Sequence, residues 1–414
     1  MPGNLDTDRA RQYFEEAEAL FAEDGGALWG HPLDGPLIFV DYETRRVVAN
    51  QPDREGRLTH REGVWVGTIP PEVVVANTAM TWAGAHWTMV LWQALPQHPA
   101  RRVALLAHEA FHRIQTELGL APPDIPNANV HLDTLEGRTW LQLEWRALEA
   151  ALIVDGEKQR TAVEHALVFR RTRQSLFPGG AAEERALEMH EGLAEYTGLR
   201  LSSTTPEQVA DHVREAPSRY PSFVGSFAYA SGPAYGFLLD QIAPGWRIGL
   251  TTDDDLGELA REALGLAVPQ SLTQQAVELA KTYDGDTLRA TEEARDRERQ
   301  VEIAAYRERL WEGPVFILPL SEGVQCAFDP RATVPMADLG TVFPFVHVSD
   351  RWGVLDVAEG GLLMATDWKT ARITAPEDKE GSPLKGAGWT LELSAGWRIE
   401  AGRRPGDLEV VERG

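Results

Sequence analysis

Two histidines four residues apart, His108 and His112, enclose a glutamate, Glu109, in the segment RRVALLAHEAFHRIQTELG. Apolar residues recur on one face of this segment, which predicts a helix. Side chains four apart on a helix share a face, with Cβ atoms about 5–6 Å apart, so both imidazoles can bind one zinc ion. Glu109 can then take a proton from a water at that ion. The alternative is an amphipathic helix whose histidines are merely packed or exposed.

A second segment, ALEMHEGLAEYTG, can supply a further ligand. A catalytic zinc site needs three protein ligands and one open position for water, so a third ligand must come from elsewhere in the chain. Glu191 and Glu195 lie four apart on a predicted helix, where one can bind the metal and the other can orient a ligand histidine. Glu136, Glu144 and His190 are the competing third ligands.

Together these segments resemble the pattern of the gluzincin family of zinc metallopeptidases, the thermolysin-like enzymes with HExxH followed at a distance by EGxAEY. The resemblance implies one Zn²⁺ ion held by His108, His112 and Glu191. It also implies that Glu109 is the general base and that Glu195 orients a ligand histidine. The implied activity is hydrolysis of peptide bonds in a peptide or protein substrate by metal-activated water.

The segment SFAYASGPAYGFLLDQI carries a candidate for stabilising the oxyanion. Tyr229 and Gly232 resemble the Tyr-x-x-Gly segment of gluzincin aminopeptidases, in which the tyrosine hydroxyl fills this role. A phenol with a pKa of about 10 is a neutral hydrogen-bond donor at neutral pH. The alternative is a buried tyrosine with a satisfied hydroxyl group, and Tyr235 is the fallback candidate.

A strand upstream of the HExxH segment is a candidate lining of the substrate cleft. Gly84, Ala85, His86 and Trp87 stand where the aminopeptidase branch carries Gly-Ala-Met-Glu. Trp87 thus replaces the glutamate that binds the free amine of the substrate, so specificity for N-terminal residues is not implied. His86 and Trp87 are candidate substrate contacts, although aromatic residues on such a strand are more often part of the core.

The pattern of apolar, β-branched and turn-forming residues along the chain predicts an α+β protein with two domains. Apolar spacing predicts an opening helix over residues 6–23, β-branched runs predict a small sheet over about 36–92, and helical periodicity dominates about 100–312. The resemblance makes residues 1–312 a mainly helical, thermolysin-like metallopeptidase domain. Short apolar runs between Gly, Pro and Asp predict an all-β domain, a sandwich or small barrel, over 313–414.

Composition excludes some classes of partner. The 63 acidic and 40 basic residues give a formal net charge of −23, which would repel nucleic acid. No apolar run reaches the roughly 18–20 residues of a membrane span. The single cysteine, Cys326, has no partner for an internal disulfide. The first residues lack the pattern of a secretory signal, and the compartment stays open.

Two other functions fit parts of the sequence. A peptidase-like scaffold could act as a non-catalytic peptide- or carbohydrate-binding protein, but such a protein is expected to have lost Glu109 or a metal ligand. A helical di-metal carboxylate site could use Glu136 and Glu144, but that site needs two E-x-x-H motifs. Zinc-dependent peptide hydrolysis is therefore the function that the sequence favours.

Overall fold

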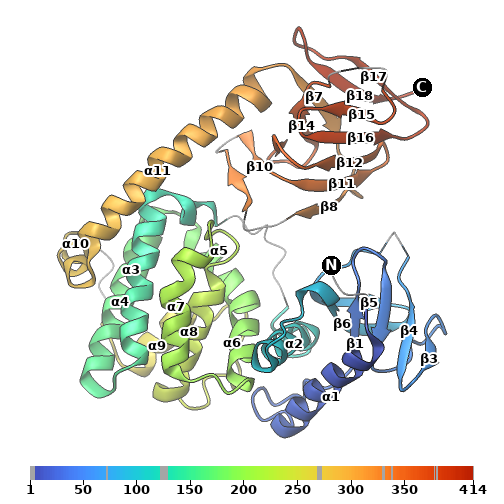
Figure 1. Ribbon diagram of the computed structural model, residues 1–414. Helices are drawn as coiled ribbons and strands as arrows, with labels where there is room; N and C mark the ends of the chain where they lie inside the picture. Colours follow the sequence, from blue (N-terminus) through green and yellow to red (C-terminus); the bar gives the residue numbers. More distant parts are fainter. Residues whose placement is uncertain are drawn as a thin grey trace. The chain divides into compact units, whose positions relative to one another are not determined.

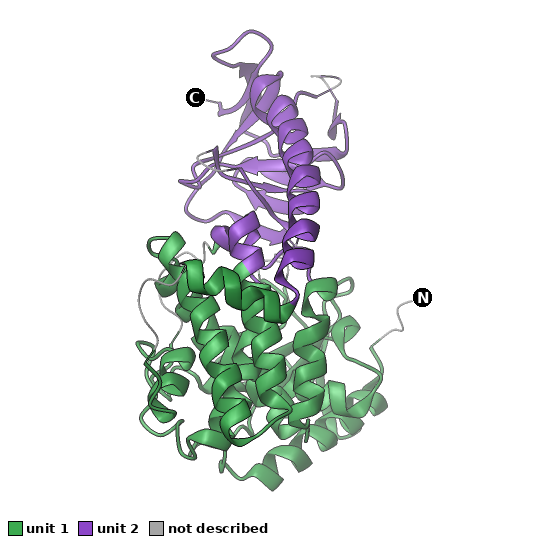
Figure 2. Ribbon diagram, turned by 90° about the vertical axis from the view of Figure 1, so that its left-hand side faces the viewer, with its two compact units in different colours: residues 1–129, 140–219, 226–283 green, residues 130–139, 220–225, 284–414 purple. Residues whose placement is uncertain are grey.

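The computed structural model describes residues 5–70, 73–121, 129–267, 273–328, 332–336, 339–376, 378 and 381–413. These residues combine helices with several β-sheets, so the predicted α+β class is confirmed at that level. The chain divides into two units, one of residues 1–129, 140–219 and 226–283, the other of residues 130–139, 220–225 and 284–414 (Figure 2). The boundary predicted between residues 312 and 313 falls inside the second unit, shortly before β7 (Val315–Pro319).

The first unit opens with α1 (Thr7–Asp24), whose ends carry clear signals. The Asp6 carboxylate accepts hydrogen bonds from two N–H groups of the first turn, and Gly25 ends the helix in the left-handed conformation. Phe14 on the buried face of α1 stacks on Phe39 with ring centroids 4.4 Å apart. This contact fixes α1 against a β-sheet.

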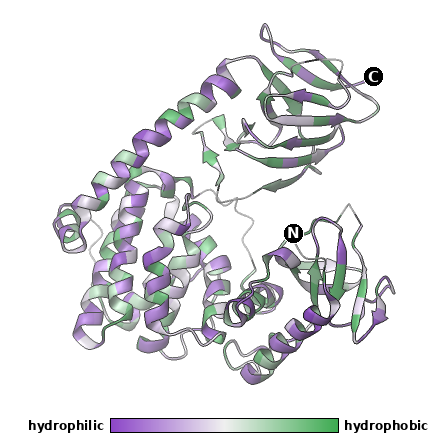
Figure 3. Cartoon of the chain, in the orientation of Figure 1, coloured by the Kyte–Doolittle hydropathy of each residue, from purple (hydrophilic) through white to green (hydrophobic). Residues whose placement is uncertain are grey.

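That sheet has six strands in the order β3-β4-β2-β1-β6-β5. The strands are β1 (Leu37–Val40), β2 (Arg46–Ala49), β3 (Thr59–Arg61), β4 (Val64–Thr68), β5 (Thr78–Trp82) and β6 (Ala85–Leu91). The neighbouring strands β1 and β6 are parallel. Every residue of β1 is buried, and the strand is apolar throughout (Figure 3). A continuous apolar run of this kind is typical of a strand that is covered on both faces.

Among the residues that the structure describes, the first unit contains nine α-helices besides α1, which are labelled in Figure 1. They are α2 (Pro99–Ile114), α3 (Leu135–Leu152, shared with the second unit), α4 (Gly156–Leu176), α5 (Gly180–Leu187), α6 (Leu193–Leu201), α7 (Pro206–Arg219), α8 (Ala228–Ile242), α9 (Leu256–Ala263) and α10 (Thr273–Ala280). A π-helical turn, Glu188–Gly192, joins α5 to α6. Helix α6 packs closely on α2, since a Cβ on Gly198 would lie only 2.4 Å from the carbonyl oxygen of Ala104. Glycine at this position therefore lets the two helices approach.

The second unit contains α11 (Gly285–Arg307), a π-helical turn (Glu308–Glu312) and two sheets. One sheet has the order β17-β18-β7-β14-β13-β10-β9 and the other β15-β16-β12-β11-β8. The remaining strands are β8 (Gln325–Phe328), β9 (Val334–Pro335), β10 (Thr341–Phe343), β11 (Val346–Asp350), β12 (Gly353–Val357), β13 (Leu362–Met364), β14 (Thr370–Thr374), β15 (Leu384–Gly386), β16 (Trp389–Leu393), β17 (Trp397–Ala401) and β18 (Leu408–Glu412). One buried cluster takes residues from both sheets, among them Phe316 of β7 and Leu355 of β12. The two sheets therefore share a hydrophobic core.

Two expectations from composition can be compared with the described part of the chain. No helix there is long and apolar enough to cross a lipid bilayer. Cys326 is a free, half-buried thiol on β8.

Candidate metal centre

Helix α2 directs His108 and His112 toward one point. The helix begins with Pro99 at its first turn, and its buried face includes both Phe111 and Ile114, so packing fixes its rotation. The two imidazole rings have centroids 4.9 Å apart, and their Nε2 atoms lie 3.1 Å from each other. Both rings are almost completely buried. One helix thus supplies two ring nitrogens to a single location, as the spacing predicts.

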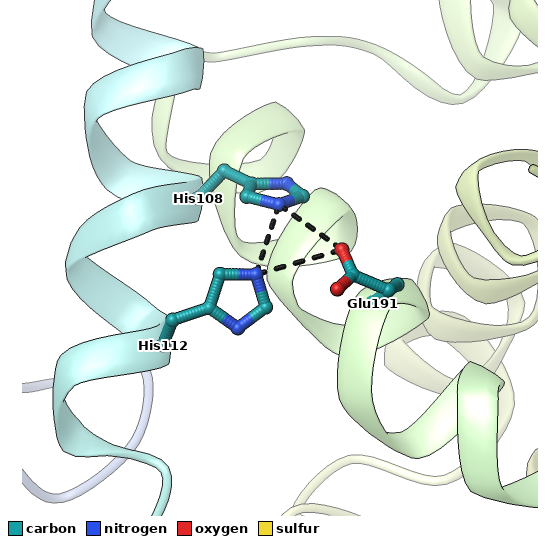
Figure 4. A group of neighbouring side chains, drawn as sticks. All are labelled: His108, His112 and Glu191. Carbon is teal, nitrogen blue, oxygen red and sulfur yellow. Dashed lines mark hydrogen bonds and ion pairs between the residues drawn. The ribbon is translucent and has the colours of Figure 1, made fainter. Parts of the chain in front are cut away.

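The π-helical turn places Glu191 opposite these two nitrogens (Figure 4). Its Oε2 lies 3.5 Å from Nε2 of His108 and 3.5 Å from Nε2 of His112. Two ligands each about 2.0–2.1 Å from a tetrahedral zinc ion are separated by about 3.3 Å. The three donor atoms therefore have the types and the spacing that suit Zn²⁺, and among the described residues they form a group able to hold a metal.

Glu195 contacts the other side of the His108 ring. It lies on α6, one turn after Glu191, and its Oε2 is 3.0 Å from Nδ1 of His108. Such a carboxylate accepts the Nδ1 proton and leaves the Nε2 lone pair for a metal. Burial alone would lower the pKa of His108, but Glu191 and Glu195 outweigh it and raise this pKa well above its usual value. The same negative field favours a bound cation.

The other candidate ligand histidine, His112, has a partner that the sequence analysis missed. Nδ1 of His112 is 2.7 Å from Oε1 of Gln115, a buried residue that follows α2. Nε2 of Gln115 donates to the carbonyl oxygens of Met189 and His190, at 3.3 and 3.0 Å. The available signal was the spacing, because residues three apart on a helix are neighbours.

Glu109 lies beside the candidate ligands and is buried, with a relative exposure of 5%. Its Oε2 has no hydrogen-bond partner among the described residues. Burial raises the pKa of Glu109, although the neighbouring imidazoles of His108 and His112 act in the opposite direction. A carboxylate in such a place is a stronger base than one in water.

Tyr229, in the first turn of α8, also belongs to this group of side chains. Its hydroxyl donates to Oε2 of Glu191 at 3.0 Å, and its ring centroid is 5.9 Å from that of His108. Burial has the largest effect in raising the pKa of Tyr229, and the nearby carboxylates raise it further, so the phenol stays neutral. A Cβ on Gly232 would lie 2.3 Å from the Cα of Gly192, so two glycines let α8 meet the π-helical turn and bring Tyr229 to Glu191.

The competing third ligands have other partners. Glu144 is fully buried, and its Oε1 accepts from the hydroxyl of Tyr235 at 2.7 Å while its Oε2 pairs with Arg173 at 2.5 Å. Tyr235, the fallback for the oxyanion, is therefore tied to this buried ion pair. The carboxylate of Glu136 pairs with Arg289.

His190 does lie at the site, although outside the three-ligand group. Its ring centroid is 4.6 Å from that of His112, and its Nε2 is 3.4 Å from Oε1 of Glu191. Burial, together with the charge of His112, lowers the pKa of His190 to about 4. An imidazole therefore lies beside the three candidate ligands without belonging to that group.

The strand residues proposed to line a substrate cleft belong to the β5–β6 hairpin. Gly84 occupies the turn with a positive φ of 73°, and Ala85 is buried at the start of β6. Trp87 is 0% exposed and its indole donates to the carbonyl of Trp82, so it is a core residue and the proposed contact with substrate is corrected. His86 is exposed, and its Nδ1 is 3.1 Å from the hydroxyl of Thr81 across the hairpin.

The arrangement offers two imidazole nitrogens, one carboxylate oxygen and a separate buried carboxylate. Three ligands leave a fourth position open for water in a tetrahedral zinc site. Comparisons with family models, curated proteins and solved structures find no match for this chain. Its chemistry is therefore inferred from its own residues.

Proposed function

We propose that the protein is a zinc-dependent metallopeptidase of the gluzincin type, with His108, His112 and Glu191 as the metal ligands. The observation that carries this proposal is the set of donor-atom distances, 3.1, 3.5 and 3.5 Å, which bracket the separation of about 3.3 Å expected around tetrahedral zinc. A buried carboxylate follows the first ligand directly along the helix. The proposal extends to the thermolysin-like arrangement of the helical part and to a peptide or protein substrate.

A zinc ion in this site would lower the pKa of a bound water to about 7 and polarise the carbonyl of the substrate. Glu109 accepts the proton of the attacking water and passes it to the leaving amine. Glu109 is buried, and its Oε2 has no hydrogen-bond partner in the described part of the chain, so that oxygen is available for this transfer.

Tyr229 is proposed to stabilise the oxyanion. Its hydroxyl lies 3.0 Å from the Glu191 oxygen that faces both ligand imidazoles, so it is adjacent to the proposed metal position. A neutral phenol with a raised pKa donates a hydrogen bond without losing its proton. Removing one oxyanion donor costs roughly 10²–10³ in rate, which is the expected effect of Tyr229→Phe.

The test separates metal binding from catalysis. Purified wild-type protein, Glu109→Gln and Glu117→Gln are analysed for metal and incubated with a peptide library, with and without a chelator. Glu117 is an exposed residue of the same chain segment, so its variant makes the same chemical change away from the site. Glu109→Gln should retain zinc and lose nearly all hydrolysis, while Glu117→Gln should match wild type. Full activity in Glu109→Gln would refute the mechanism.

A further inference from the structure

Gln115 contacts both segments that carry the candidate metal ligands, helix α2 with its two histidines and the π-helical turn with Glu191. It lies one helical turn after His112, and only 1% of its surface is exposed. Its side chain makes three hydrogen bonds, one with a ligand histidine and two with the backbone of the π-helical turn that carries Glu191. A side chain buried between the ligand helix and the third-ligand turn is well placed to control both.

The orientation of the Gln115 amide follows from the groups around it. The carbonyl oxygens of Met189 and His190 can only accept, so the amide NH₂ group must face them. Oε1 must then face His112, and because this oxygen only accepts, Nδ1 of His112 carries the proton. The remaining nitrogen, Nε2, presents its lone pair to the proposed metal position.

Glu195 has the same effect on the other ligand, since it accepts from Nδ1 of His108. With both Nδ1 atoms protonated, two Nε2 lone pairs face each other across 3.1 Å, with Oε2 of Glu191 at 3.5 Å from each. Converging lone pairs repel one another, and a proton on one of the two Nε2 atoms can relieve this repulsion only between two of the three acceptors. A metal ion satisfies all three acceptors at once.

Gln115 also holds the backbone next to the third ligand. His190 directly precedes Glu191, and the Gln115 bond to its carbonyl is the shorter of the two backbone contacts. A π-helical turn departs from the regular i to i+4 pattern of the helix, and such turns often occur at functional sites. Hydrogen bonds from a fixed side chain would hold this turn in the conformation that directs Glu191 toward the histidines.

We infer that Gln115 is a positioning residue for the metal, which sets the tautomer of His112 and fixes the turn carrying Glu191. This inference rests on the metal site of the proposed function and is independent of peptidase activity. An amide suits both tasks because it accepts on one side and donates on the other. A carboxylate at this position could serve His112 but would repel the two carbonyl oxygens.

The test measures zinc affinity by competition with a chromophoric chelator in wild type, Gln115→Met and Gln115→Glu. The matched control is Gln159→Met, because Gln159 is also buried in the first unit and donates to two backbone carbonyls, at 3.2 and 3.2 Å. Loss of a residue that orients a metal ligand typically weakens metal binding 10–100-fold, so we expect a loss of about this size for Gln115→Met. Gln159→Met should bind zinc as wild type does, even if its apo-protein unfolds at a lower urea concentration.

Gln115→Glu separates the two tasks and also serves if Gln115→Met does not fold. We expect it to weaken zinc binding at least tenfold, because the contacts to the turn are lost. The visible spectrum of the cobalt-substituted protein should change in both Gln115 variants and not in Gln159→Met. Wild-type affinity in Gln115→Met would overturn the inference, and wild-type affinity in Gln115→Glu would overturn the role at the turn. If wild type itself binds no zinc, the proposed function fails together with the inference, whereas zinc binding without peptide hydrolysis contradicts only the peptidase assignment.

Discussion

Glu195 provides a quantitative test of how His108, a proposed metal ligand, is held. Oε2 of Glu195 lies 3.0 Å from Nδ1 of His108, and the side chain of Glu195 is 25% exposed. The change Glu195→Gln keeps an oxygen that can accept the Nδ1 proton but removes the negative charge. The geometry of His108 should therefore survive while the imidazole becomes a weaker donor to the metal.

The expected size follows from this contact. Hydrogen bonds to charged groups contribute about 1.5–3 kcal/mol, and partners that orient a metal ligand contribute about 10–100-fold in metal affinity. Because solvent screens a quarter-exposed carboxylate and Gln keeps one hydrogen bond, we expect about a tenfold loss for Glu195→Gln, or about 1.4 kcal/mol. Glu195→Ala, which removes both charge and hydrogen bond, should approach a loss of about 100-fold.

The assay is a competition titration of zinc at pH 7 and fixed ionic strength, with thermal unfolding of each apo-protein as a check of folding. Glu258→Gln is the control for the lost charge, because Glu258 lies in the same unit and pairs with Arg171 and Arg261. It should leave zinc affinity unchanged. Equal affinities in wild type and Glu195→Ala would show that this carboxylate does not support the metal, and the reasoning would be refuted.

Three further predictions concern stability. Gly232→Ala would place a Cβ 2.3 Å from the Cα of Gly192, so α8 must move away from the π-helical turn. We expect the free energy of unfolding in urea to fall by about 3 kcal/mol. An unchanged urea midpoint would contradict the close contact. Zinc at about 1,000 times its Kd should raise the free energy of unfolding by about 4 kcal/mol. Removal of the zinc by a chelator should therefore lower the Tm by roughly 10 °C in calorimetry, and an unchanged Tm would argue against a bound metal. Burial would raise the pKa of Asp53, but the backbone N–H groups of residues 55, 57 and 58 donate to its carboxylate and lower that pKa. The ionised carboxylate of Asp53 therefore stabilises the fold fully above pH about 4, and this stabilisation is lost as the pH falls further. Asp53→Asn should lower the free energy of unfolding by about 1–2 kcal/mol at pH 7 and by less at pH 2. An equal decrease at both pH values would contradict this account.

Local patterns predicted much of the site. The four-residue spacing of His108 and His112 depends only on helical geometry, and the structure places both side chains on one face of α2. The spacing of Glu191 and Glu195 likewise gave them separate tasks, and the two carboxylates contact different nitrogens of His108. Such relations hold within a single turn of helix, so they are readable from a short stretch of residues.

Other features depend on contacts between distant segments. Whether Glu144 or Glu191 would be the third ligand could not be decided by helical spacing alone, since both lie on predicted helices. The structure buries Glu144 with Arg173, which comes from a different helix. Trp87 was a candidate substrate contact because it stands where the aminopeptidase branch carries a glutamate. Sequence position does not show which face of a strand is covered, and the fold buries Trp87 completely.

The sequence by itself determined the kinds of chemical group available and their spacing along each helix, because backbone geometry fixes which side chains share a face. Only the tertiary structure decided which helices meet. The contact between Gly192 and Gly232 brings Tyr229 to Glu191, and the bonds of Gln115 join two segments far apart in the chain. Such contacts arise from packing between whole elements, which no local pattern specifies.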